Sequence, residues 1–249
     1  MELISPLELP ELPNGSSWDG RIAFLDRDGV LIIGSEEYVN NVDEVVLLPD
    51  SALSAGNLRR AGFRICVVTN QSPVGRGLWS QSNLSRIHKQ MCRLLLKQDG
   101  DAQLDLILHS PYAPWEGAWA RKPHPGMLEA GRQLMDAASS DPTLEGLKLK
   151  FGDDWIGRPD ESNSVMVGDR GVDMSAAARY GVRGLLCDGD AGLASVVDSI
   201  LGDSACAPKS VPVSLESGWM TRTIRNRVVL LTRSTTCFIP LIHRSLDSN

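Results

Sequence analysis

The sequence has few cysteines, no long apolar run and no basic N-terminal segment. Its five cysteines form no CxxC pair, and none lies near a second Cys or His at zinc-finger spacing, which indicates reduced thiols in a cytoplasmic protein. No apolar stretch approaches the roughly 20 residues that a membrane span requires. The N-terminus carries acids and prolines instead of a basic start and an apolar run, so we expect no secretory signal.

The chain also lacks an excess of positive charge. Its 249 residues carry a net charge of −6, which argues against a broad nucleic-acid surface or a basic membrane patch. The length is sufficient for one sizeable core with additions, and by itself it allows one or two domains. The partner that we expect is therefore a small molecule, with neither nucleic acid nor membrane involved.

Short apolar runs alternate with segments that have helical spacing. We expect strands at residues 21–26, 63–69, 104–109, 165–167 and 182–187, and helices at residues 50–61, 80–97, 125–138 and 173–180. Asp50 is the expected N-cap of the first helix, and residues 30–48 are compatible with a small hairpin. The alternation predicts an α/β fold with a doubly wound, mainly parallel, Rossmann-like sheet.

The pattern divides the chain into three parts. Residues 1–20 are an irregular leader, residues 21–202 form the main domain, and residues 203–249 are a C-terminal extension. Within the main domain, the polar segment 139–163 contains Gly and Pro and is expected to be a surface insertion. In the extension, the apolar run 227–243 is either an appended strand or part of a poorly ordered tail.

Two acids, Asp26 and Asp28, follow the first expected strand, and Gly29 comes next. The carboxyl ends of parallel strands form the edge at which open α/β folds bind ligands. One acid there can attack phosphorus while the other handles the proton of the leaving group, and a divalent ion would relieve their repulsion. A loop with two solvated acids and a turn glycine gives the same pattern, so the pair alone leaves both interpretations open.

Polar residues also follow the later strands. Thr69 and Asn70 can hold a phosphate oxygen, although turns favour such residues too. Lys122, before the 125–138 helix, can neutralise a phosphoryl group or be an exposed loop cation. Asp169 offers the hard oxygen ligand that suits Mg²⁺. Asp173 is either a partner of this metal site that does not bind the ion directly or a helix N-terminal acid. At successive strand ends, these residues make a complete set for phosphoryl transfer.

Longer strings extend these motifs: FLDRDGV, TNQSPVGRG, RKPHPGM and VGDRGVDM occur in this order. With them the chain resembles, over about residues 21–187, the haloacid dehalogenase-like phosphatase superfamily. The finer match is to the branch that contains D-glycero-D-manno-heptose 1,7-bisphosphate phosphatase and histidinol phosphatase. The resemblance implies a fold without a large cap domain and a short flap after Asp28.

The resemblance implies two catalytic residues and a metal site. Asp26 would be the nucleophile that becomes an aspartyl phosphate. Asp28 would be the general acid for the leaving alcohol and then the base for water. Asp26, the backbone carbonyl of Asp28 and Asp169 would bind Mg²⁺.

It also implies a set of substrate contacts. Thr69 and Asn70 would bind the phosphoryl group, and Lys122 would stabilise its charge. Arg121 would contact the substrate, and Arg76 would contact a distal phosphate.

One segment departs from the branch, which usually has a zinc loop with Cys and His ligands before the RKP motif. The corresponding positions here are Ser110, Tyr112, Ala118 and Ala120. They do not form a zinc ligand set, so zinc is not expected. Trp115 and Trp119 would then either hold the loop by packing or line the mouth of the substrate site.

The sequence therefore predicts a monomeric, Mg²⁺-dependent phosphatase that hydrolyses a small phosphate monoester. A sugar bisphosphate such as D-glycero-D-manno-heptose 1,7-bisphosphate is the expected substrate, and histidinol phosphate is the alternative. A non-catalytic binding or regulatory protein on the same fold is a further alternative, which would need a broken site; no catalytic position is missing.

Overall fold

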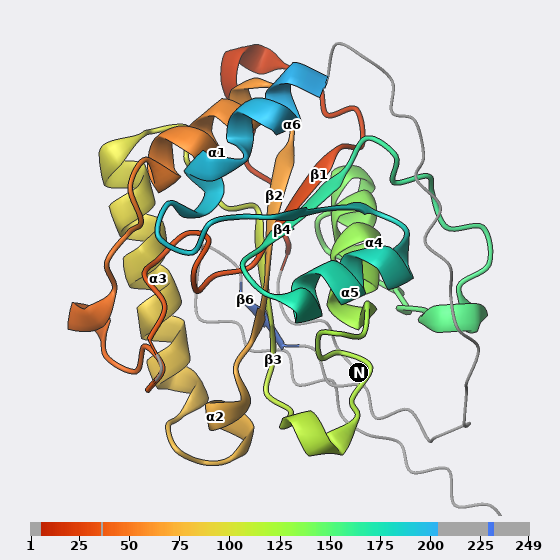
Figure 1. Cartoon of the computed structure of the whole chain (residues 1–249). Coiled ribbons are helices and arrows are strands. Elements are labelled where there is room, and N and C mark those ends of the chain that lie inside the picture. Colours follow the sequence, from red (N-terminus) through yellow and green to blue (C-terminus); the bar gives the residue numbers. More distant parts are fainter. Residues whose placement is uncertain (1–5, 36, 204–228, 232–249) are drawn as a thin grey trace, which may run out of the picture.

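A computed structural model describes residues 6–35, 37–203 and 229–231 of the chain. Figure 1 shows the described part with a central sheet and helices on both of its faces. The predicted α/β, doubly wound fold is confirmed, and no separate cap domain is found among the described residues.

The sheet holds six strands in the part of the chain that is described: β1 (Ile22–Leu25), β2 (Arg64–Asn70), β3 (Leu106–Ser110), β4 (Val165–Gly168), β5 (Arg183–Leu186) and β6 (Val229–Leu231). Their order in space is β5-β4-β1-β2-β3-β6. The first five strands are parallel, and β6, from the apolar run 227–243, is appended to β3 in the antiparallel direction. The order reverses between β1 and β4, which is where such sheets bind ligands.

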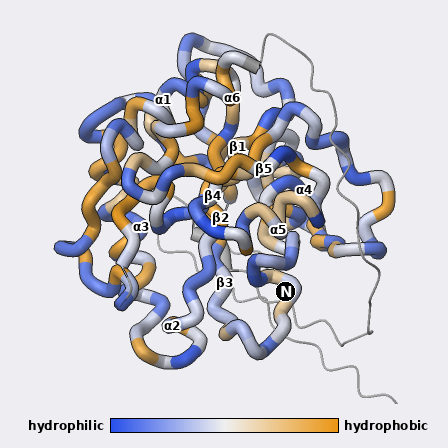
Figure 2. The backbone as a smooth tube through the Cα atoms, viewed as in Figure 1, coloured by the Kyte–Doolittle hydropathy of each residue, from blue (hydrophilic) through white to orange (hydrophobic). Residues whose placement is uncertain are grey.

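Helices cover the two faces of the sheet unequally. One face carries α1 (Ser51–Arg60), α3 (Gln81–Gln98) and α6 (Val197–Asp203), and the other carries α4 (Gly126–Ser140) and α5 (Gly171–Tyr180). Neighbouring residues of β1 point to opposite faces, so Ala23 and Leu25 join one core cluster while Ile22 and Phe24 join the other. Figure 2 shows the resulting apolar centre. Burial on both faces explains why the strands are apolar without alternation.

Two helix starts illustrate the local sequence signals. Ser80 caps α3, and its hydroxyl accepts a hydrogen bond from the Asn83 amide at 3.1 Å. Asp50 precedes α1 as predicted, but its side chain makes no capping hydrogen bond because the residue has left-handed backbone angles (φ 52°). The short helix α2 (Ser72–Gly75) lies between β2 and α3, where no helix was expected from the sequence.

The segment after Asp28 folds back on itself as a short flap. Ile32 pairs with Leu47 in an isolated antiparallel bridge, and the Ile33 amide donates to the Val46 carbonyl at 2.9 Å. This hairpin-like pairing agrees with the expectation for residues 30–48. A 3-10 helix, Val42–Glu44, follows the flap's outer turn.

The N-terminal segment is irregular but packed. Within its described residues, 6–20, the one regular element is the 3-10 helix Pro13–Gly15. A buried ionic cluster next to the sheet holds this segment in place. In the cluster, Asp105 binds both Arg59 (2.6 Å) and Arg64 (2.8 Å). Arg59 also donates to the Glu11 carbonyl at 2.7 Å, and Arg64 donates to that of Pro10 at 3.0 Å.

The remaining segments lie outside the strand and helix framework. After α4 ends at Ser140, the described chain up to residue 163 contains one regular element, the 3-10 helix Gly152–Asp154. This segment nevertheless buries Leu144 against the α4–α5 core. The predicted extension 203–249 lies outside the described residues, except for Asp203 and β6. Among the described helices, none has the length and apolar character that crossing a membrane would require.

Candidate active site

The centre of the site is an ion pair between Asp26, which follows β1, and Lys122, from the loop between β3 and α4. Both side chains are fully buried, with 2.9 Å between the Lys122 Nζ and the Asp26 Oδ2. The other Asp26 oxygen, Oδ1, accepts from the Arg27 amide at 2.7 Å. Burial alone would raise the pKa of Asp26, but the charges of Lys122 and Arg170 outweigh it and hold this pKa below its usual value. Asp26 is therefore an ionised, fixed carboxylate.

Lys122 is shared with a second carboxylate, that of Asp173 in the first turn of α5. The Lys122 Nζ lies 2.6 Å from Asp173 Oδ1, and Asp173 Oδ2 accepts from the Arg170 amide at 3.1 Å. The helix N-terminal role that the sequence allowed for Asp173 is therefore observed, and its role beside the metal site stays a prediction. Gly168 permits this approach, since a Cβ there would collide with the Asp173 side chain. Burial, followed by repulsion from Asp26, raises the pKa of Asp173.

Asp169 lies at the end of β4 beside the turn that follows Asp28. A Cβ on Gly29 would collide with the Asp169 carboxylate, and Gly29 has φ 74°, so glycine is required there on both counts. This contact brings the Asp28–Gly29 peptide next to Asp169. Burial raises the pKa of Asp169, and the nearby Asp26 charge adds to the effect.

Asp28 is held at the side of the site rather than pointing freely into solvent. Its carboxylate accepts three hydrogen bonds from the Arg27 guanidinium, at 2.9 to 3.1 Å. Gln71 donates to Asp28 Oδ2 at 3.2 Å and to Thr69 Oγ1 at 3.0 Å. Neither Arg27 nor Gln71 was expected from the sequence to be a functional residue, and the signal for both was their position inside the motifs FLDRDGV and TNQSPVGRG.

The two polar residues at the end of β2 differ in their surroundings. Thr69 is buried, and its hydroxyl lies in the hydrogen-bonded group with Gln71 and Asp28. The Asn70 amide is engaged by the Lys122 backbone: it donates to the Lys122 carbonyl at 3.0 Å and accepts from the Lys122 amide at 3.1 Å. Asn70 thus fixes the lysine loop.

The three arginines near the site are placed differently. Arg170 is half-exposed and reaches both Asp26 and Asp169 at 3.5 Å. Arg121 is half-buried and donates to the Tyr112 carbonyl at 2.8 Å; burial lowers the pKa of its guanidinium, which also feels Tyr38 and Arg170. Arg76, at the end of α2, is exposed, and its side chain makes no ion pair with the described residues.

The loop in which the resemblance would place zinc is held by a tryptophan. The Trp119 indole donates to the Glu129 carboxylate of α4 at 2.6 Å, and the second Glu129 oxygen accepts from the Gly152 amide at 3.0 Å. Trp115 has 74% of its surface exposed and does not pack in the loop. Of the two alternatives for these rings, Trp119 fills the packing role.

The carboxylates fit a divalent cation. Asp26, Asp169 and Asp173 each offer an oxygen within 4.8 Å of the others, and Asp169 Oδ1 is buried without a hydrogen-bond donor. Lys122 and Arg170 are two cations for three carboxylates, so the cluster keeps a surplus negative charge, and hard oxygen donors suit Mg²⁺. Asp173 is already bound by Lys122 and the Arg170 amide, so Asp26 and Asp169 are the better placed side-chain ligands.

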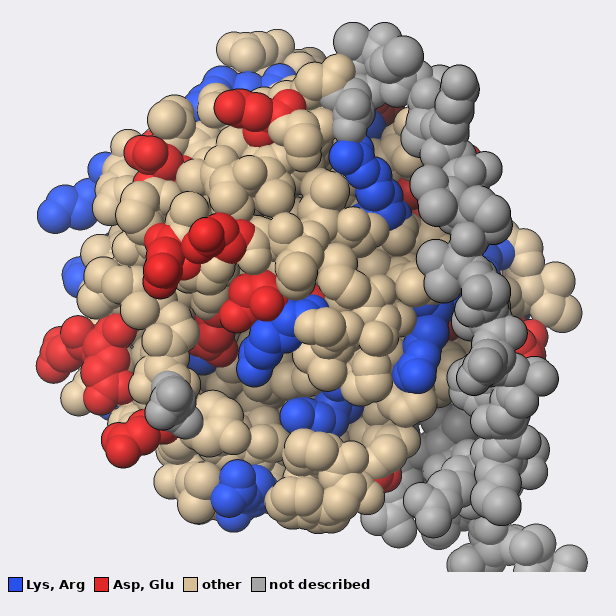
Figure 3. All heavy atoms as spheres, in the orientation of Figure 1, with Lys and Arg blue, Asp and Glu red and all other residues tan. Residues whose placement is uncertain are grey.

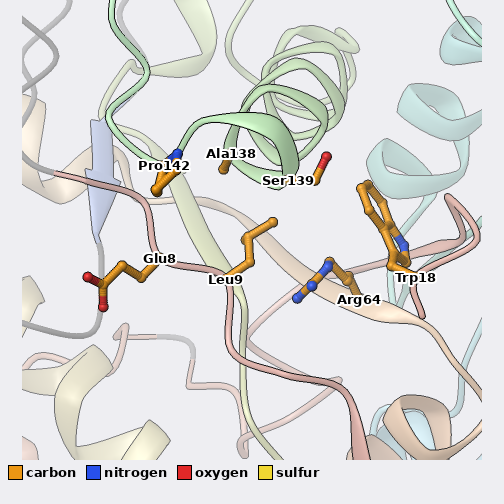
Figure 4. A pocket seen from close by; sticks show the side chains of 7 residues that line it. All are labelled: Glu8, Leu9, Trp18, Arg64, Ala138, Ser139 and Pro142. Atoms are coloured by element: carbon orange, nitrogen blue, oxygen red, sulfur yellow. The ribbon is translucent and has the colours of Figure 1, made fainter. Parts of the chain in front are cut away.

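A cavity of about 500 Å³ lies elsewhere, and Figure 4 shows its lining: Glu8, Leu9, Trp18, Arg64, Ala138, Ser139 and Pro142. Arg64 begins β2, whereas Thr69 ends it. The cavity therefore lies near the amino ends of the parallel strands, whereas the acids lie at their carboxyl ends. Figure 3 shows acidic and basic side chains interspersed on the face in view, with no field of one sign.

Comparisons with known proteins agree with this geometry. Residues 119–215 match the family model described as HAD-hydrolase-like. A D-glycero-beta-D-manno-heptose-1,7-bisphosphate 7-phosphatase of Mesorhizobium japonicum is 33% identical over 177 residues, covering 68% of this chain and 70% of that protein. The chain belongs to the haloacid dehalogenase-like phosphatase family.

A solved structure of this family extends the match to the fold. D,D-heptose 1,7-bisphosphate phosphatase from Bordetella bronchiseptica, complexed with magnesium and phosphate, has a TM-score of 0.59 and 27% sequence identity, and the match covers 74% of this chain and 99% of that one. The similarity to the Pseudomonas aeruginosa heptose bisphosphate phosphatase is shorter, at 36% identity over 107 residues and 43% of this chain. There the chain spans 59% of the length of its relative.

Proposed function

We propose that the protein is a Mg²⁺-dependent phosphatase that hydrolyses a small sugar phosphate through an aspartyl-phosphate intermediate. The observation that carries the proposal is the buried Asp26 carboxylate, ionised and fixed by Lys122 at 2.9 Å. A nucleophile needs an unprotonated carboxylate in a defined position, and the charge of Lys122 supplies both conditions. The similarity to a family structure complexed with magnesium and phosphate supports the same reaction.

In the first step, an Asp26 oxygen attacks phosphorus while the bond from phosphorus to the leaving oxygen breaks. Asp28 gives its proton to that oxygen, so an alcohol leaves and Asp26 carries the phosphoryl group. Lys122, the Thr69 hydroxyl and the Asn70 backbone stabilise the charge on the phosphoryl oxygens.

In the second step, water attacks the phosphorus of the aspartyl phosphate. Asp28, now ionised, takes a proton from the water, and the bond between Asp26 and phosphorus breaks. Phosphate is released, Asp26 returns as a carboxylate and Asp28 is protonated again. One residue therefore serves as acid and then as base.

Asp26, Asp169 and the backbone carbonyl of Asp28 would hold the Mg²⁺. The bound ion would neutralise phosphate charge next to the carboxylates. Arg121 and Arg170 lie near one another and provide positive charge for a second phosphate, with Arg76 further out. This arrangement favours a bisphosphate over a monophosphate.

The test is a substrate panel with Mg²⁺ that contains D-glycero-D-manno-heptose 1,7-bisphosphate, histidinol phosphate, hexose phosphates and p-nitrophenyl phosphate. We expect the heptose bisphosphate to give the highest kcat/KM, and Asp26→Asn to abolish turnover of every substrate. Fastest turnover of histidinol phosphate would replace the substrate assignment. Phosphate release by the Asn variant would refute the nucleophile, and inactivity of the wild type on all substrates would favour a binding protein.

We further propose that residues 21–202 form the catalytic unit and that the protein acts as a cytoplasmic monomer without structural zinc. The free thiols of the buried Cys66 and Cys187 support a reducing compartment. Cell fractionation, light scattering and metal analysis test the compartment, the oligomeric state and the zinc content in turn.

A further inference from the structure

Asp28 is backed by a group of polar side chains that lies under the site and that the mechanism does not use. Arg27 has none of its surface exposed. Its Nε and Nη2 bind the Asp28 carboxylate, and its Nη1 lies 3.3 Å from His88 Nε2 on α3. Beyond His88 lies His109 of β3, with 6.2 Å between the two ring centroids.

The charges in this group define the role of each member. Burial, followed by the Arg27 charge, lowers the pKa of His88 well below its usual value and that of His109 to about 3. Both rings are therefore neutral at pH 7. A neutral His88 can accept from the Arg27 Nη1 through its Nε2, with its proton on Nδ1. The buried guanidinium then has one carboxylate partner among the described residues, that of Asp28.

We propose that Arg27 is a positioning residue that holds the Asp28 carboxyl at the reacting atoms, and that His88 holds Arg27 in turn. This inference rests on the proposed function, in which Asp28 moves the proton. A planar guanidinium that binds one carboxylate through two nitrogens fixes its orientation as well as its distance. The acceptor at His88 keeps the third arm of the fork from turning.

The other groups around Asp28 cannot replace this contact. Gln71 gives one hydrogen bond, at 3.2 Å, to a single oxygen, and one bond leaves the carboxyl free to rotate about it. Arg170 is half-exposed and pairs with Asp26 and Asp169 instead. Arg27 is thus the element that defines the plane of the Asp28 carboxyl.

The first experiment compares Arg27→Lys with the wild type on two leaving groups. Lysine keeps the charge but lacks the fork, so Asp28 stays paired and loses its fixed plane. A displacement of about 1 Å can cost about 10²-fold in rate. We therefore expect kcat on the heptose bisphosphate to fall about 100-fold with KM nearly unchanged.

A substrate whose leaving group needs little protonation distinguishes a loss of Asp28 positioning from general damage to the fold. The p-nitrophenolate ion needs little protonation to leave, so Arg27→Lys should still give a normal burst of it in the first turnover. The slow step should be the later attack by water, which needs Asp28 as base. A burst that is lost together with kcat would overturn the positioning role.

A matched control is Arg59→Lys, which alters an equally buried arginine at the opposite edge of the sheet, bonded to Asp105. We expect it to lower the melting temperature. The ratio of kcat on the heptose bisphosphate to the size of the p-nitrophenolate burst should stay unchanged. If Arg59→Lys changes this ratio as much as Arg27→Lys does, the ratio reports stability and the inference fails.

His88 provides a test that does not depend on altering Arg27. The Oε1 of glutamine can take the place of Nε2 and accept from Arg27, whereas leucine cannot. We expect His88→Gln to retain most of kcat on the heptose bisphosphate. His88→Leu should lose about tenfold, less than the roughly 10²–10⁴-fold that a proton-transfer group contributes in full, with the burst intact. Equal activities of the two variants would overturn the second half of the proposal. An inactive wild type would instead contradict the proposed function itself.

Discussion

Replacing Lys122 with Met tests the electrostatic core of the site. The ammonium lies between the fully buried carboxylates of Asp26 (2.9 Å) and Asp173 (2.6 Å), so the three groups carry a net charge of −1. Methionine has a similar length but no charge, and it leaves two buried carboxylates side by side with a net charge of −2. Asp173→Asn leaves Lys122 and Asp26 as a neutral pair.

The size of the effect follows from this difference. Removing one partner of a buried ion pair costs about 3–5 kcal/mol, and because Lys122 has two partners we expect about 5 kcal/mol at pH 7. In a chain of this size such a loss lowers Tm by about 10–20 °C. Asp173→Asn should lose less than half as much, since no carboxylate is left without a counter-charge.

The stability difference between Lys122→Met and the wild type should depend on pH in a defined direction. In Lys122→Met, burial and mutual repulsion favour uptake of a proton by one of the two carboxyls in the folded state, which raises its pKa above the unfolded value. The loss of stability therefore applies in full at high pH and is relieved as the pH falls through this raised pKa. Urea unfolding in EDTA, followed by tryptophan fluorescence, should therefore show a gap from the wild type that narrows between pH 7 and pH 5. A gap below about 1 kcal/mol at pH 7, or an equal loss in Asp173→Asn, would refute the reasoning.

Three further changes test other parts of the structure. Trp119→Phe leaves the buried Glu129 carboxylate without its indole donor, and we expect urea unfolding to show a loss of about 1–3 kcal/mol. Because the indole and not zinc holds this loop, a zinc chelator should leave the wild-type melting curve unchanged, and a shift of the curve would contradict the absence of zinc. Because His109 cannot take up a proton until about pH 3 when folded, its contribution to stability is lost as the pH falls below 6.5, so His109→Gln should flatten that decline by about 1.4 kcal/mol per pH unit. Inorganic phosphate should bind in calorimetry with Mg²⁺ and only weakly in EDTA, and equal affinities would argue against a metal among Asp26 and Asp169.

The sequence was sufficient to predict the five parallel strands along the chain and the end of the sheet at which the acids gather. Parallel strands bring their carboxyl ends together, so Asp26, Thr69 and Asp169 meet because each follows or ends a buried apolar strand. The same rule predicted Lys122 less directly, because a loop lies between β3 and the lysine. Its burial depends on the Asn70 amide, which binds the Lys122 backbone on both sides.

The side chains that the sequence did not indicate are those whose environment is tertiary. Arg27 stands between two acids in a loop, where an arginine usually points to solvent. It is buried because α3 and β3 bring His88 and His109 beneath it. Asn70 was expected to bind substrate, but hydrogen bonds to Lys122 engage its side chain. Residues 52 positions apart meet in that contact, and no local pattern records it.

The two basic residues of the centre have complementary effects on the two acids. Lys122 is shared between Asp26 and Asp173, so it orients Asp26 without fully cancelling its charge, and Asp26 remains able to attack phosphorus. Arg27 is given to Asp28 alone and controls its direction. A shared cation suits a nucleophile, which must stay negative, whereas a dedicated bidentate cation suits a group that must return to the same place after each proton transfer. Exchanging the two arrangements would therefore weaken both steps of the reaction.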